Sequence, residues 1–112
     1  MKPPSNRQLQ YNYSVINRRA YGGKLPPVEF VHWKELRGKD KRVYYGTCDW
    51  KIVKEFGFGH IAINFDLHYG EKQWLLTLIH EIVHYTKGDY CRNRKFQSEV
   101  FRVMNKMNWR LL

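Results

Sequence analysis

The chain has 112 residues, 43% of them hydrophobic and 16% aromatic, which is enough apolar surface for one folded core and too little chain for two domains. Its longest apolar run, residues 74–79, is far shorter than the roughly 20 residues of a membrane span, and residues 1–7 lack the apolar segment of a secretory signal. Together these features predict a cytoplasmic single-domain protein over 1–112, with no membrane contact and a flexible segment at 1–8.

The first expected element is an amphipathic helix that ends at Gly22-Gly23. Its apolar residues recur at helical spacing, namely Leu9, Tyr13, Ile16 and Ala20. Prolines at 26 and 27 then favour extended backbone, and residues 28–33 are typical of a strand. Turn-forming residues at 38–41 precede a second strand at 42–48, so we expect these two strands to pair as a hairpin.

The second half of the chain is richer in helical patterns. Residues 51–56 fit either a continuing strand or a short helical turn, whereas residues 60–65 are apolar on both faces and predict a central third strand. Apolar residues recur at helical spacing over 71–86 and again over 93–108. Only residues 87–92 separate these helices, so they should pack as an antiparallel pair in a small α+β fold.

Charge is uneven along the chain. Twenty Lys and Arg against ten Asp and Glu give a net charge of +10. Residues 1–24 hold five basic and no acidic residues, 25–86 hold eight of each, and 87–112 hold seven basic and two acidic, which gives +5, 0 and +5. Two cationic flanks beside a neutral centre favour DNA or another nucleic acid as partner, with Arg92, Arg94 and Lys95 as candidate contacts. The alternative is a surface charge that serves solubility alone.

The residues His80-Glu81-Ile82-Val83-His84 form the HExxH motif on the predicted helix 71–86. Residues four apart share one helical face, so both imidazoles can reach one Zn²⁺. Glu81 can then act as the general base toward a water molecule at the open position of the metal. The alternative is a hydrogen-bonded histidine pair with no metal, although two His and a Glu are unusual choices for a buried segment.

Three stretches, residues 25–30, 59–64 and 76–84, together resemble the SprT-like (Spartan-like) zinc metallopeptidase domain, over residues 25 to about 105. The resemblance implies a zincin fold, zinc as cofactor, ligand roles for His80 and His84, the catalytic role for Glu81, and protein substrates close to DNA. The family places its third ligand, a histidine, at the position that Arg92 occupies in this chain. Residues 96–103 resemble the helix that follows that ligand.

The third zinc ligand therefore has to come from elsewhere, and the candidates are Glu99, Cys91 and Asp89. Glu99 is preferred, because two antiparallel helices of equal rise would place it opposite His80 and because it lies on the buried stripe of its helix. Cys91 lies nearer to the family's histidine and would bind as a thiolate, although two cysteines in a reducing compartment are expected to be free thiols.

Two functions follow from these patterns. The first is a zinc-dependent metallopeptidase that acts on proteins at or near DNA. The second is a basic nucleic-acid-binding protein in which the histidines hold a structural or vestigial metal, without peptidase activity. The oligomeric state and the cleavage preference leave no signature in the sequence.

Overall fold

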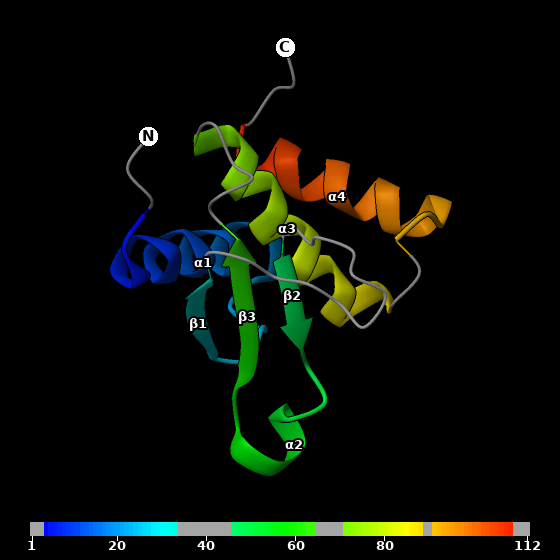
Figure 1. The fold of residues 1–112 in the computed structure, drawn as a ribbon. Coiled ribbons are helices and arrows are strands. Elements are labelled where there is room, and N and C mark those ends of the chain that lie inside the picture. Colours follow the sequence, from blue (N-terminus) through cyan, green and yellow to red (C-terminus); the bar gives the residue numbers. More distant parts are fainter. Residues whose placement is uncertain (1–3, 34–45, 65–70, 89–90, 109–112) are drawn as a thin grey trace.

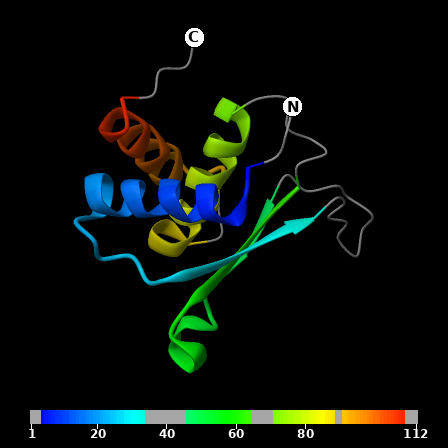
Figure 2. The ribbon, with the colours of Figure 1, turned by 90° about the vertical axis from the view of Figure 1, so that its left-hand side faces the viewer.

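The computed structural model describes residues 4–33, 46–64, 71–88 and 91–108. Within these residues the chain forms an α+β domain with four helices and a three-stranded mixed sheet (Figure 1). The elements are α1 (Asn6–Tyr21), β1 (Val28–Trp33), β2 (Gly46–Asp49), α2 (Val53–Phe56), β3 (Gly59–Asn64), α3 (Glu71–Lys87) and α4 (Arg94–Lys106). The three long helices gather on one side of the sheet, and short α2 lies at its far end (Figure 2).

Local chemistry fixes both ends of α1. The Ser5 hydroxyl accepts a hydrogen bond from the backbone N–H of Gln8, and the Gln8 side chain accepts one from the Ser5 N–H. This reciprocal pair starts the helix inside the segment 1–8 for which the sequence predicts flexibility. The helix ends as expected at Gly22, which adopts the left-handed conformation with φ 61°.

The strand order is β1-β3-β2, which confirms that β3 is central. The predicted hairpin between 28–33 and 42–48 is wrong, because β1 pairs with β3 in parallel and β2 pairs with β3 in antiparallel orientation. The strand β2 therefore turns back on the strand that follows it, through a connection that contains α2. The physical reason is the burial of β3 on both faces. Its apolar side chains lose most contact with water when β3 is the central strand, with one strand paired along each of its edges. The turn expected at 38–41 lies outside the described residues.

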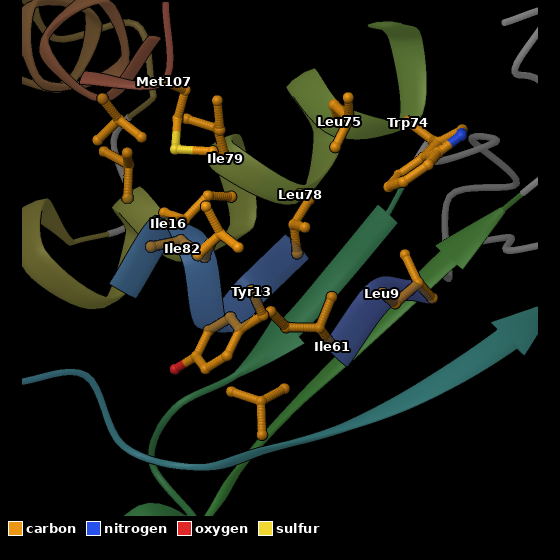
Figure 3. Close-up of a cluster of buried hydrophobic side chains, with 14 of the residues drawn as sticks. Leu9, Tyr13, Ile16, Ile61, Trp74, Leu75, Leu78, Ile79, Ile82 and Met107 are labelled. Atoms are coloured by element: carbon orange, nitrogen blue, oxygen red, sulfur yellow. The ribbon is translucent and has the colours of Figure 1, made fainter. Parts of the chain in front are cut away.

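The core lies between the sheet and the three long helices (Figure 3). Helix α1 packs on β1 and α4, whereas α3 packs on β2, β3 and α4. The fully buried side chains of α3 are Leu78, Ile79, Ile82 and Val83. These four residues span an arc of about 140° at 100° per residue, so α3 is held along one broad face and can present polar side chains beside that face at fixed positions. No described helix combines the length and the apolar character that crossing a membrane requires.

Candidate metal centre

His80 and His84 share one face of α3, as the motif spacing predicts. Their Nε2 atoms lie 3.2 Å apart. Two nitrogens bound to one tetrahedral zinc at about 2.0–2.1 Å would be separated by about 3.3–3.4 Å. Both rings also pack against Phe96 of α4, with ring centroids 5.0 Å from His80 and 4.8 Å from His84. The two imidazoles thus have the separation that a shared metal ion requires, and Phe96 supports both of them.

The end of α3 orients the ring of His84. Its Nδ1 lies 2.8 Å from the backbone carbonyl oxygen of Gly88 and donates to it, because a carbonyl can only accept. With the hydrogen on Nδ1, the Nε2 lone pair is available for a metal. Burial, and then the neighbouring His84, lower the pKa of His80. His80 is therefore neutral near neutral pH, which is the form that binds metals.

A third metal-binding side chain comes from the segment between α3 and α4. The ligand atoms of His80, His84 and Cys91 all lie within 4.8 Å of one another. A sulfur at about 2.3 Å from a tetrahedral zinc would lie about 3.6 Å from each nitrogen, so Cys91 has to approach by at most about 1.2 Å. The Gln97 side chain donates a 2.7 Å hydrogen bond to the Cys91 carbonyl and ties this segment to α4. The group could therefore hold a metal ion.

Glu81 follows His80 directly in α3, and its side chain faces β2 of the sheet. Its side chain is 5% exposed, and burial raises the pKa of the carboxyl group. Two neighbours act in the opposite direction, first the Cys48 thiol through a hydrogen bond and then the charge on His84. Burial therefore lets Glu81 hold a proton more readily than an exposed carboxyl group does, which is a property that a general base needs.

The strand β2 forms the wall against which Glu81 lies. A Cβ atom at Gly46 would lie 3.3 Å from Glu81 Oε1, 2.8 Å from Thr77 Cγ2 and 3.0 Å from the Ala62 carbonyl oxygen. The absence of a side chain at Gly46 therefore lets α3 approach the sheet closely. Directly after β2, the indole Nε1 of Trp50 donates a 2.9 Å hydrogen bond to the Glu81 backbone carbonyl. The backbone and the side chain of Glu81 are thus held by the same stretch of chain.

Glu99, the ligand that the sequence favours, does not belong to this group. Its Oε1 lies 2.6 Å from Arg102 Nε, and its Oε2 accepts hydrogen bonds of 3.0 Å from Arg102 Nη2 and from the Tyr21 hydroxyl. The Arg102 hydrogen bond is the main cause that lowers the pKa of Glu99. The sequence estimate, which assumed two antiparallel helices of equal rise, placed Glu99 opposite His80. In the structure Phe96, three residues earlier in α4, contacts both histidines instead. Glu99 lies instead where α4 meets α1.

The other predicted site residues have different fates. Arg92, Arg94 and Lys95 are exposed on the segment before α4 and on its first turn. Asp89, the remaining candidate ligand, lies outside the described residues. His60 of β3 pairs in the sheet register with Glu29 and Asp49 and is not part of the metal-binding group found among the described residues.

Sequence reasoning missed three residues around Glu81. They are Gly46, Cys48 and Trp50, all from β2 and the residue after it. The sequence offered one signal, an alternation of small and polar residues in 46–49 that contrasts with the apolar strands 28–33 and 60–65. That alternation fits an edge strand beside a site, but it does not say which helix the strand approaches.

Comparison of the chain with protein-family models, with curated proteins and with solved structures finds no match. The resemblance to SprT-like domains therefore stays a prediction from the sequence motifs.

Proposed function

We propose that this protein is a zinc-dependent peptidase of the SprT-like zincin type that acts on protein substrates close to nucleic acid. The observation that carries the proposal is the 3.2 Å separation of the His80 and His84 Nε2 atoms, with Cys91 beside them and Glu81 on the neighbouring face of the same helix. Three protein ligands leave one position of a tetrahedral ion open, which is the arrangement of catalytic rather than structural zinc.

In the proposed mechanism His80, His84 and Cys91 hold the ion. A metal at this position supplies a Lewis acid that polarises the scissile carbonyl and lowers the pKa of water. Glu81 accepts the proton of the attacking water and then delivers that proton to the leaving amine. Its burial supports this role, because a raised pKa makes the carboxylate a stronger base for the first transfer, while the Cys48 hydrogen bond, which lowers the pKa, keeps the protonated group able to release the proton in the second.

The position of β2 supports an extended peptide as the substrate. In the described sheet β2 lies at one end of the strand order, so the edge away from β3 has no strand partner among the described residues. An extended chain can add to such an edge through backbone hydrogen bonds. A peptide bound along β2 would pass Gly46, whose neighbour in space is the Glu81 carboxylate. Unfolded or loosely folded proteins are therefore the expected substrates.

The test combines metal analysis with a cleavage assay. Purified protein is measured for zinc content by elemental analysis, and an unfolded protein substrate is offered with and without DNA and with and without a chelator. One zinc per chain and chelator-sensitive cleavage are expected. Metal binding without cleavage under every condition would instead support the alternative, a basic nucleic-acid-binding protein with a structural metal.

A further inference from the structure

A pocket of about 360 Å³ lies between the last turn of α3 and the first three turns of α4. It is lined by Lys87, Arg94, Lys95, Ser98, Glu99 and Arg102. Four of these six side chains are cationic, and they come from two different helices. The pocket is separate from the group formed by His80, His84 and Cys91, because it shares no residue with it.

One carboxylate, Glu99, lines the pocket among the residues that the structure describes, and it is already engaged. Both oxygens of Glu99 accept hydrogen bonds from Arg102, and Oε2 also accepts one from Tyr21. Glu99 and Arg102 therefore form an ion pair on the α1 side of the pocket, and the charge of Lys87 also acts on Glu99. Lys87, Arg94 and Lys95 line the same pocket, and within the described part of the chain Glu99 is the one acidic side chain of its lining.

The placement of two of these cations is unfavourable for the helix itself. Arg94 and Lys95 occupy the first turn of α4, which holds no acidic residue and where the helix dipole is positive. Repulsion among Lys87, Arg94 and Lys95 adds to the cost at α4. A bound anion would remove both penalties at once.

We propose that this pocket binds a phosphate group of a nucleic-acid backbone. A guanidinium group and two ammonium groups match the charge and the oxygen geometry of a phosphate, and the Ser98 hydroxyl can donate a further hydrogen bond. Lys87, Arg94, Lys95 and Ser98 are all exposed, so a phosphate within a long polymer can enter. The proposal rests on the nucleic-acid part of the proposed function and is independent of the peptidase part.

The experiment compares two charge-matched double variants of the full chain. Lys87→Ala/Lys95→Ala removes one ammonium group from each side of the pocket. Lys51→Ala/Lys54→Ala removes two exposed lysines at α2, at the far end of the sheet (Figure 1). Affinity for a short DNA duplex is measured by fluorescence anisotropy across a salt series, inorganic phosphate is titrated by NMR, and thermal melting confirms that both variants fold.

The pocket variant is expected to lose about tenfold or more in DNA affinity, with a shallower salt dependence, because charge-assisted phosphate contacts are removed. The α2 variant should lose far less. Equal losses in the two variants would reduce the effect to net charge and overturn the proposal. Phosphate binding that depends on the pocket, together with unchanged DNA affinity, would assign the pocket to free phosphate and also overturn it. Because no protein substrate is present, a chain that cleaves nothing still gives a decisive result.

Discussion

Two carboxylates on neighbouring helices of this protein have opposite environments. Glu81 of α3 is buried against β2, has a hydrogen bond with the Cys48 thiol, and has a raised pKa. Glu99 of α4 is held by the Arg102 guanidinium and the Tyr21 hydroxyl and has a lowered pKa. Among the described residues, the first group has the Cys48 thiol as its main polar partner, whereas the second has the Arg102 guanidinium and the Tyr21 hydroxyl.

Under the proposed function, this difference would separate a reactive carboxylate from a structural one. A carboxylate that gives up and takes back a proton near neutral pH needs an environment that penalises its charge. A carboxylate that joins two helices needs an environment that stabilises its charge, and Arg102 does this while also donating a 2.9 Å hydrogen bond to the Ala20 carbonyl of α1. Substitution of Glu81 should therefore affect activity, whereas substitution of Glu99 should affect stability.

The largest expected effect follows from Glu81→Gln. The amide keeps the shape of the side chain but cannot accept the proton, so peptide cleavage should fall by about 10²–10⁴-fold while the zinc content stays at one per chain. Single-turnover cleavage and elemental analysis of the same preparation measure the two quantities. Full activity in this variant would remove Glu81 from the mechanism.

Next in size is the effect of Cys91→Ala on the metal. Loss of one of three protein ligands should weaken zinc binding by at least about 100-fold, since even outer-shell partners of a ligand are worth 10–100-fold. Competition with a fluorescent chelator gives the affinity. Glu99→Gln is the matched control and should bind zinc as the wild type does. A weakened Glu99→Gln with an unchanged Cys91→Ala would restore Glu99 as the ligand.

A smaller effect is expected from the thiol that contacts Glu81. Cys48→Ala removes a hydrogen bond to a charged group, which should lower kcat/KM about tenfold without a change in zinc content. Cys48→Ser retains a donor and should recover part of the loss. If Cys48→Ala and Cys48→Ser are both as active as the wild type, Cys48 has no part in positioning the carboxylate.

The smallest effect concerns the stability that Glu99 provides. The Arg102 side chain is 40% exposed, so the ion pair is partly screened and Glu99→Gln should cost about 1 kcal/mol at neutral pH. The pKa of Glu99 is lower in the folded chain than its ordinary value of 4.5. The contribution is therefore complete above about pH 4.5 and is lost as the pH falls through the folded pKa. Urea unfolding at pH 7 and at pH 3 should show the difference between wild type and variant shrinking at the lower pH.

Much of the fold was predictable from periodicity. The helix through Leu9, Tyr13 and Ile16 and the helix that carries His80 and His84 were found because burial on one face leaves a repeat in the sequence. Strand pairing was not predictable in the same way. A strand such as β2 is compatible with any neighbour of suitable length, and the choice of β3 over β1 depends on burial in the assembled sheet.

In the candidate site, too, the local part was predictable from the sequence and the part that depends on tertiary packing was not. The two histidines and Glu81 are neighbours in sequence, so helix geometry alone placed them. The choice between Glu99 and Cys91 depended on how α4 crosses α3, and a shift of three residues along one helix replaces the facing residue by Phe96. Gly46 and Cys48 meet Glu81 only through the tertiary fold.

The end of α3 has a consequence for kinetics. Gly88 donates its N–H to the His84 carbonyl and accepts the hydrogen of the His84 ring, at a left-handed φ of 82° that other residues rarely adopt. Fraying of that last turn therefore frees the imidazole in the same event. Metal dissociation should be gated by this local opening, so amide hydrogen exchange at Gly88 should slow when zinc binds.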